Sequence, residues 1–258
     1  MCWRWRECGM DKRDFARKAP VYWENCVEST NTRLLELANN GADSGTVLYA
    51  DSQSGGRGRR GRSFLSPEGG LYMSMLVRPA CEVEECTQLT PLAAVAAHRA
   101  LKVCTGLHAD IKWPNDLLLG GKKLCGILTE LSFDQKGKPQ LIIGIGINLN
   151  TPSFPEELKD IACSIYSHSG KSIKKEALLE LLVRELDGCI DRWEMEGCFF
   201  LEEYRRLCIC IGRDVLVVSG TESRKTRALN INDDLSLLVQ YEDGSQESLY
   251  SGEVSLRI

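Results

Sequence analysis

The most distinctive stretch of the chain is a run of glycine and arginine at residues 55–62. Four glycines and four arginines fill these positions in the order Gly-Gly-Arg-Gly-Arg-Arg-Gly-Arg. Glycine lets backbone amides approach a ligand closely, and successive amides can form a concave site for an anion. Arginine adds a planar set of donors that suits phosphate and carboxylate. The run predicts a loop that folds over a small anionic molecule. The alternative is a solvated basic linker or a nonspecific RNA contact.

Two groups further along the chain suit the same chemistry. Residues 112–116 read Lys-Trp-Pro-Asn-Asp, and Lys123 follows shortly after them. An acid near a strand end can hold Mg²⁺ or orient a nucleophile, and a lysine can bind carboxylate or phosphate. We therefore expect Asp116 and Lys123 in a site. Lys112 and Trp113 are expected to shape the pocket rather than to take part in chemistry.

A third segment, residues 142–148, reads Ile-Ile-Gly-Ile-Gly-Ile-Asn. Gly144 and Gly146 leave one face of a predicted strand without side chains, as expected where a ligand lies flat on a sheet. A bulge or tight packing between the strand and a helix explains the pattern equally well. The chain has no GxxxxGK[ST] phosphate-binding motif, and no GxGxxG pattern follows a strand and opens a helix.

Short polar residues stand at the start of a predicted helix. Ser29, Thr30 and Asn31 precede or open the apolar pattern at residues 31–40. Ser29 or Thr30 can cap this helix. The same side chains, together with the amides of the helix start, can also bind a polar ligand group.

Composition and charge limit the possible functions. The chain has 258 residues, 43% hydrophobic and 26% charged, with a formal net charge of -4. The length is enough for one large domain and a small one. The hydrophobic and charged fractions are typical of a globular protein. An acidic balance argues against a general nucleic-acid-binding protein, which is usually basic. The arginine-rich run is therefore read as a local site on an acidic protein.

The cysteines predict a reducing environment. There are 12 of them, no CxxC pair occurs, and no histidine stands at zinc-ligand spacing from a cysteine. We expect free, mostly buried thiols in a cytoplasmic protein. The N-terminal residues lack the apolar core of a signal peptide, and no apolar run reaches the ~18 residues of a membrane span.

Hydrophobic periodicity and turn residues divide the chain into three parts. We expect a charged arm, in part helical, at residues 1–20, a catalytic domain at 21–211 and a small β-barrel at 212–258. Strands are expected at 21–27, 46–50, 71–77, 117–119, 124–131 and 142–148, and helices at 31–40, 92–104, 174–196 and 199–207. Residues 149–173 are expected to be rich in loops. Barrel strands are expected at 214–219, 226–231, 235–241, 246–250 and 254–257.

Together these segments resemble biotin protein ligases, also called biotin–[acetyl-CoA-carboxylase] ligases. The resemblance rests on Ser29-Thr30-Asn31, Gln53 to Arg62, Lys112 to Asp116, Lys123 to Glu130 and Gly144 to Asn148, in this order. Residues 251–255, which read Ser-Gly-Glu-Val-Ser, also resemble the ending of that family. The likeness covers roughly residues 22–258.

The resemblance implies an α+β fold. A class II synthetase-like domain with a mixed, largely antiparallel sheet and flanking helices would precede a small SH3-like β-barrel. It also implies an ATP-dependent reaction in two steps. The biotin carboxylate attacks the α-phosphate of ATP, giving biotinyl-5′-AMP and pyrophosphate. A lysine of a biotin carboxyl carrier protein then attacks the adenylate and releases AMP. Biotin and ATP are the implied substrates, Mg²⁺ the implied metal and the carrier the implied partner.

The resemblance also implies roles for single residues. Catalytic roles fall on Arg57, Arg59, Asp116 and Lys123, with Asp116 as the ligand of Mg²⁺. Biotin binding falls on Ser29, Thr30, Asn31, Gln53, Arg57, Gly58, Arg59, Lys123, Gly126, Gly144 and Gly146. Nucleotide binding falls on Arg59, Arg60, Arg62, Asn115 and Asn148. The glycine–arginine run then becomes a lid that is disordered without ligand and closes over biotin, which keeps water from the adenylate.

Two departures from the family pattern matter. Only 28 residues precede Ser29. They are too few for the N-terminal helix-turn-helix domain of about sixty residues that many bacterial relatives carry. We therefore expect a ligase that does not bind DNA or repress genes, either a monomer or a homodimer. Residues 149–165 also hold no aromatic residue placed to stack on adenine, and Tyr166 lies just beyond them, so the adenine contacts stay open.

Two alternatives remain at this point. A lipoate or octanoate protein ligase shares the fold and the transfer of an acyl group to lysine, but its pocket takes a linear chain. A nonenzymatic protein that binds nucleic acid through the arginine run is the alternative from another class, and it would bind with a steep dependence on salt.

Overall fold

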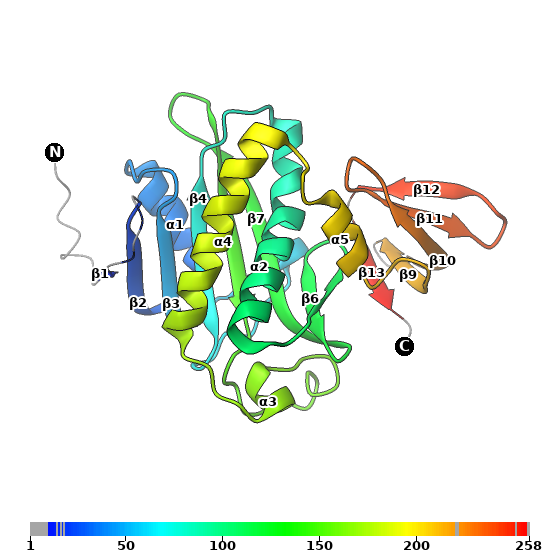
Figure 1. The fold of residues 1–258 in the computed structure, drawn as a ribbon, viewed down its shortest axis with the longest axis horizontal. Coiled ribbons are helices and arrows are strands. Elements are labelled where there is room, and N and C mark those ends of the chain that lie inside the picture. The colour runs from blue at the N-terminus through cyan, green and yellow to red at the C-terminus, as the bar shows by residue number, and fades with distance from the viewer. Residues whose placement is uncertain are drawn as a thin grey trace.

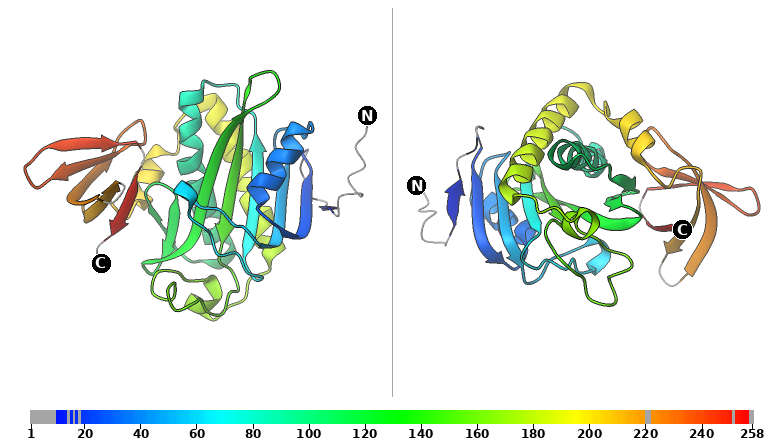
Figure 2. Two further views of the ribbon diagram at one scale, coloured as in Figure 1. Left: turned by 180° about the vertical axis from the view of Figure 1, so that it is seen from behind. Right: turned by 60° about the horizontal axis from the view of Figure 1, so that its bottom comes forward.

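The computed structural model describes residues 10–13, 15, 17, 19–219, 222–250 and 252–256. They form a sheet of eight strands and, further along the chain, a second sheet of five strands (Figure 1). Helices lie against both faces of the larger sheet (Figures 1 and 2). The fold is therefore the expected α+β arrangement, with a mixed, mostly antiparallel sheet, flanking helices and a small β domain toward the C-terminus.

The larger sheet has the strand order β1-β2-β3-β4-β8-β7-β6-β5. Its strands are β1 Asp11–Arg13, β2 Val21–Val27, β3 Val47–Gln53, β4 Leu71–Val77, β5 Asp110–Lys112, β6 Asp116–Leu119, β7 Lys122–Phe133 and β8 Pro139–Ile147. Every neighbouring pair is antiparallel except β2 and β3. That parallel pair is joined through α1 (Thr30–Asn39), because parallel neighbours need a crossover connection. The crossover brings the start of α1 to the same end of the sheet as the end of β3.

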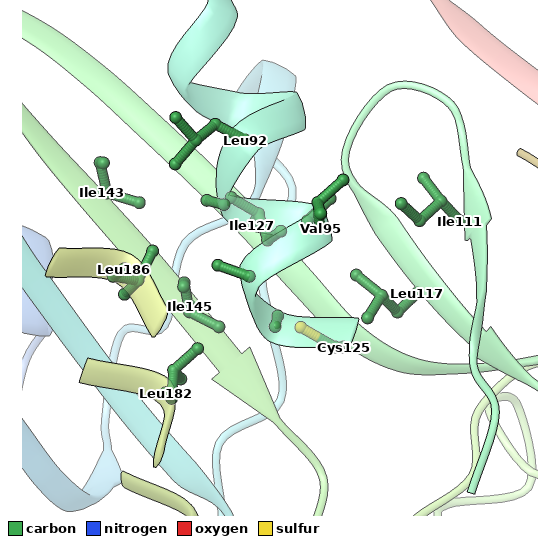
Figure 3. Packing of buried hydrophobic residues seen from close by; sticks show 14 of the residues in the cluster. Leu92, Val95, Ile111, Leu117, Cys125, Ile127, Ile143, Ile145, Leu182 and Leu186 are labelled. Atoms are coloured by element: carbon green, nitrogen blue, oxygen red, sulfur yellow. The ribbon is translucent and has the colours of Figure 1, made fainter. Parts of the chain in front are cut away.

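The two faces of the sheet carry different helices. The helices α2 (Leu89–Thr105) and α4 (Lys175–Glu196) cover one face and α1 covers the other (Figures 1 and 2). Side chains of β8 alternate between the faces, as a strand requires. Ile143 and Ile145 belong to the core under α2 and α4, where Figure 3 shows them beside Leu186, and Ile142 packs with α1. The odd-numbered residues of β8 thus build the core, and its even-numbered glycines face the α1 side.

A tight turn sets the register of two strands that carry predicted site residues. Gly120 and Gly121 connect β6 to β7 with φ angles of 59° and 80°. A two-residue hairpin turn with positive φ at both positions strongly favours glycine, and the predicted hairpin is confirmed. The pairing that results places Asp116 opposite Gly126.

The smaller sheet is antiparallel and has the order β12-β11-β10-β9-β13. Its strands are β9 Asp214–Ser219, β10 Glu222–Ile231, β11 Leu237–Tyr241, β12 Gln246–Leu249 and β13 Glu253–Leu256. The chain reaches it through α5 (Leu201–Leu207) and passes β5, where the Ile209 amide donates to the Ile111 carbonyl at 2.9 Å. The indole Nε1 of Trp113 donates to the Leu235 carbonyl at 3.1 Å. The domain boundary near residue 211 stays a prediction, and β9 begins shortly after it.

Three local features add to the expectations or differ from them. Residues 11–13 of the N-terminal arm form strand β1, which was not predicted, while residues 1–9, 14, 16 and 18 lie outside the described part, so that a helical portion of the arm stays a prediction. The segment expected to be rich in loops, residues 149–173, also contains one short helix, α3 (Ile165–Ser169). The helix α2 begins at Leu89, before the expected residues 92–104, because the 3-10 helix η3 (Val83–Gln88) runs directly into it.

Every cysteine in the described part of the chain is a free thiol, and most are buried or half-buried. Within the same residues, no helix combines the length and the apolar character that crossing a membrane requires.

Candidate functional site

One cavity collects almost all of the residues that the sequence singled out. It has a volume of about 150 Å³ and opens on the α1 side of the larger sheet. Its walls come from the start of α1, the end of β3, the glycine–arginine run, the turn between β5 and β6, and strands β7 and β8. The predicted residues in its lining are Ser29, Thr30, Asn31, Gln53, Arg57, Gly58, Arg59, Arg60, Arg62, Asn115, Asp116, Lys123, Gly126, Gly144 and Gly146. Val254 of β13 and Gly252, which directly precedes that strand, complete the wall.

Buried polar side chains form the end of the cavity near α1. The backbone amide and the hydroxyl of Thr30 both donate to Gln53 Oε1, at 2.9 and 3.1 Å. The Ser74 hydroxyl lies 2.8 Å from Thr30 Oγ1 and 2.6 Å from Asn31 Oδ1. Ser29 is the N-cap residue of α1, and its side chain makes no capping hydrogen bond. The polar residues at the helix start therefore bond to one another and to the sheet, while the Ser29 hydroxyl caps nothing.

Asn31 explains one of the two glycines of β8. A methyl group added to Gly144 would lie 2.1 Å from Asn31 Oδ1, which is closer than any side chain tolerates. Gly144 is thus needed for close packing between the strand and α1. This is the second of the two explanations that the sequence left open.

Phe64 explains the second glycine of β8, Gly146. The sequence alone does not predict Phe64 as a residue of the site. Its ring lies along the bare face of β7 and β8, so that a methyl group on Gly126 or Gly146 would come within 3.0 or 2.7 Å of it. The Lys123 ammonium lies 5.6 Å from the centre of the same ring, and Tyr72 meets the ring edge-on at 6.4 Å. The flat face predicted from the glycines therefore exists, and an aromatic side chain rests on it.

The glycine–arginine run is a narrow hairpin. The Gly58 amide donates to the Arg62 carbonyl at 2.6 Å, and the Phe64 amide donates to the Gly56 carbonyl at 2.8 Å. A side chain at Gly56 would collide with the backbone of Phe64. At the tip, Arg60 has a φ of 56°, a conformation that costs a residue other than glycine about 1 kcal/mol. The structure describes the whole loop, and its disorder without ligand stays a prediction.

Two arginines of the hairpin make different contacts. Arg57 Nη2 donates to Glu130 Oε2 at 2.6 Å. Arg59 Nη1 has long contacts to Asn115 Oδ1 at 3.4 Å and to the Gly252 carbonyl at 3.5 Å. Burial is the main cause that lowers the pKa of Arg59 below its usual value. Arg59 is therefore a half-buried cation with weak partners, a state that an anion would relieve.

Lys123 and Asp116 form an ion pair with 2.7 Å between Nζ and Oδ1. Asp116 is the one carboxylate among the described residues that line the cavity. The lining holds six cationic side chains against this single acid: Arg57, Arg59, Arg60, Arg62, Lys112 and Lys123. The resulting positive balance suits a ligand that carries carboxylate or phosphate.

Asn148 is placed differently from the other predicted residues. It is not among the described residues that line the cavity, and only 4% of it is exposed. Its Nδ2 donates to the Cys163 carbonyl at 3.0 Å, which ties the end of β8 to the following loop. Its contact with a nucleotide stays a prediction. Lys112 and Trp113 also line the cavity, and the expectation that they shape it rather than take part in chemistry stays a prediction.

Comparisons with known proteins agree with this geometry. The model of the biotin/lipoate A/B protein ligase family matches residues 23–148. The bifunctional ligase/repressor BirA of Bacillus spizizenii is 38% identical over 242 residues, covering 92% of this chain and 74% of that protein. The biotin–[acetyl-CoA-carboxylase] ligase of Paracoccus denitrificans is 37% identical over 175 residues, covering 66% of this chain and 71% of that protein.

A solved structure extends the likeness to the fold. The biotin protein ligase of Aquifex aeolicus, determined in complex with biotin and ATP, superposes with a TM-score of 0.81 at 34% identity. The match covers 92% of this chain and 98% of the other, so it includes both sheets. The chain therefore belongs to the biotin/lipoate A/B protein ligase family, and within it to the biotin protein ligases.

Proposed function

We propose that this protein is an ATP-dependent biotin ligase that activates biotin as biotinyl-5′-AMP and transfers it to a lysine of a biotin carboxyl carrier protein. The observation that carries the proposal is the convergence of Arg57, Arg59 and Lys123 on a cavity whose other end is lined by neutral polar side chains. Such a cavity suits a ligand with a polar uncharged head and an anionic tail, which is the chemical character of biotin. The solved relative with biotin and ATP supports the same substrates.

The neutral end would take the polar head group. Ser29, Thr30 and Gln53 offer hydroxyl and amide groups there, and the buried bonds within that end hold Thr30 and Gln53 in place. Groups that are fixed before the ligand arrives lose little entropy on binding. The head group would therefore be recognised by a preformed set of donors and acceptors.

The first step requires two anions to approach each other. The carboxylate oxygen of biotin attacks the α-phosphorus of ATP, and the bond to the leaving pyrophosphate breaks. Arg57, Arg59 and Lys123 would offset the repulsion between carboxylate and triphosphate and stabilise the charge that develops on the phosphoryl oxygens. We also assign Arg60, Arg62 and Asn115 to the side of the nucleotide, because all three line the cavity and Asn115 lies 3.4 Å from Arg59 Nη1.

Mg²⁺ fits this site as an ion carried mainly by the triphosphate. The described residues hold no cluster of three or more metal-binding side chains, and the cavity lining offers one carboxylate, Asp116. Magnesium sites in nucleotide enzymes commonly combine one or two carboxylates with substrate phosphates. When bound there, the ion would neutralise phosphate charge. Asp116 would hold it or release Lys123 toward the ligand.

In the second step, a carrier lysine attacks the carbonyl carbon of the adenylate, the carbon–oxygen bond to the phosphate breaks, and AMP leaves. The attacking amine must be neutral, so it loses a proton before or during the step. Asp116 is the acid of the cavity that can orient this amine. The hairpin at residues 56–64 would cover the adenylate and limit its hydrolysis. We expect this reaction to take place in the cytoplasm.

A direct test is to incubate the protein with biotin, MgATP and a purified biotin carrier domain, and to read the mass of the carrier. We expect an increase equal to one biotin less one water, dependent on ATP and absent when the target lysine is replaced. An unchanged carrier, together with no biotinyl-5′-AMP in the nucleotide pool, would contradict the proposal.

Lipoate or octanoate as the true substrate is tested separately by thermal unfolding. Biotin with MgATP should raise the melting temperature, because a ligand that binds only the folded state stabilises it. A shift with lipoate and none with biotin would move the assignment to the other branch of the family.

A further inference from the structure

Glu130 lies just outside the cavity and touches two of the residues that line it. One oxygen of its carboxylate, Oε2, accepts from Arg57 Nη2 at 2.6 Å and from Asn31 Nδ2 at 2.8 Å. Arg57 belongs to the hairpin at residues 56–64, which we call the cover of the cavity. Asn31 belongs to the start of α1, which we call its floor. A single carboxylate therefore joins the cover to the floor.

The floor side of this link is rigid. Asn31 is 4% exposed, and its Nδ2 also donates to the Leu128 carbonyl at 3.1 Å. Its Oδ1 accepts from the Ser74 hydroxyl. Because both ends of this amide are bonded inside the protein, Asn31 holds Glu130 in one position.

The cover side leaves Arg57 available for a ligand. Among the described residues, Glu130 is the one hydrogen-bond partner of the Arg57 side chain, and it uses Nη2 alone. Arg57 nevertheless lines the cavity. A guanidinium has five donors in a planar fork, so one corner can be held while Nε and Nη1 remain free for a carboxylate or phosphate.

We propose that Glu130 is a positioning residue for the ligase reaction: it anchors Arg57 to Asn31 and so aims the guanidinium at the anionic end of the ligand. The inference rests on the proposed function. Glu130 contacts no substrate and acts through Arg57.

The same contact allows a competing role with the opposite sign. If Glu130 competed with the ligand for Arg57, removing its charge would tighten ligand binding. If Glu130 positions Arg57, removing the charge weakens binding. The two roles are therefore separated by the direction of one measurement.

The first experiment compares Glu130→Gln with the wild-type protein for biotin affinity and for the dissociation rate of biotinyl-5′-AMP. Glutamine keeps the acceptor for Asn31 but not the charge. Because the pair is partly exposed, with 46% of Arg57 and 35% of Glu130 accessible, we expect a loss of about two- to fivefold, shrinking at high salt. Glu196→Gln is the matched control, since Glu196 pairs with Arg192 on the exposed side of α4. Equal or tighter binding by Glu130→Gln would overturn the inference.

The second experiment asks whether Glu130 acts through Arg57. Glu130→Gln is measured again in an Arg57→Gln background, where the effect should vanish. A full effect in that background would show a general structural role and overturn the inference. A wild-type protein that binds no biotin would contradict the proposed function itself. Biotin binding by the wild type, with Glu130→Gln indistinguishable from it, would remove only the role of Glu130.

Discussion

Lys123 and Asp116 pair at 2.7 Å on neighbouring strands of the cavity wall, so the cation expected to meet the substrate already holds an internal carboxylate. A substrate carboxylate or phosphate must share Lys123 with Asp116 or take it over. The pair keeps the lysine in place before the ligand arrives, since only 17% of the Asp116 side chain is exposed.

Lys123→Ala should raise the KM for biotin about tenfold or more. A hydrogen bond to a charged group contributes about 1.5–3 kcal/mol, and the change also leaves Asp116 without its cation. Lys122→Ala is the matched control, because the neighbouring lysine donates to the Lys159 carbonyl away from the cavity. Steady-state kinetics that fail to separate the two variants would remove Lys123 from the site.

Arg59→Ala should release biotinyl-5′-AMP faster, by about tenfold, without a change in thermal stability. Its present partners lie at 3.4 and 3.5 Å, so few interactions within the protein are lost, whereas the contact with the ligand is charge-assisted. Arg206→Ala, on the exposed side of α5, controls for the loss of one positive charge. The measurement is the decay of adenylate bound to the enzyme after gel filtration. An unaltered rate would contradict the role given to Arg59.

Gly144→Ala should lower the free energy of unfolding by about 1–3 kcal/mol, because the new methyl group displaces Asn31 from its buried hydrogen bonds. Gly188→Ala is the opposite case. Gly188 lies inside α4 with open space around it, so alanine should stabilise the protein by about 0.5–1 kcal/mol. Denaturant unfolding of both variants checks the pair. Similar stabilities would show that Asn31 can move without cost.

Gly146→Ala should also destabilise the protein, through a different neighbour. The added methyl group would meet the Phe64 ring at 2.7 Å, so the ring must leave the glycine face. Replacing Phe64 by alanine in the same chain should restore most of the lost stability, while ligand binding stays impaired because the flat face is no longer flat. Additive losses of stability in the double variant would show that Phe64 is not what Gly146 accommodates.

Acidification should destabilise the fold through His98. Burial is the main cause that lowers the pKa of His98, against opposing effects of the Ala109 carbonyl and Glu203, while His108 and Lys102 lower it further. The folded protein therefore binds fewer protons on His98 than the unfolded chain does. The stability from the neutral ring is present above the unfolded pKa of about 6.5 and is lost as the pH falls below it.

The slope of unfolding free energy between about pH 7 and pH 5 measures this effect. His98→Gln should flatten it. A slope identical in the variant and the wild-type protein would exclude His98 as the cause.

The sequence predicted the elements with strong periodicity and clear turns. Strand β4, helix α4 and the hairpin at Gly120-Gly121 were expected within a residue or so of where they lie. The sequence predicts too late a start for α2, because a 3-10 helix that continues into an α-helix needs no capping side chain. Strand β1 was missed because three exposed residues carry no period of their own and depend on β2.

The residues of the cavity were more predictable than their partners. Glycines and charged groups stand out in a sequence, but Ser74, Phe64 and Glu130 act through pairings between distant strands. Ser74 left one signal, as the single polar residue in the buried strand β4. Phe64 and Glu130 left none, because the register that brings them to Gly146 and Arg57 is set only when the sheet forms.

Gly252 and Val254 form part of the cavity wall, and their place in the chain determines when the cavity can be completed during synthesis. The rest of the cavity comes from residues before 150, whereas β13 leaves the ribosome after all the other strands of the two sheets. Contacts between such distant segments form late in folding. A nascent chain can therefore have its core, its hairpin and its cations in place and still hold a pocket open on one side. Under the proposed function, the reactive adenylate would therefore form only after β13 has docked.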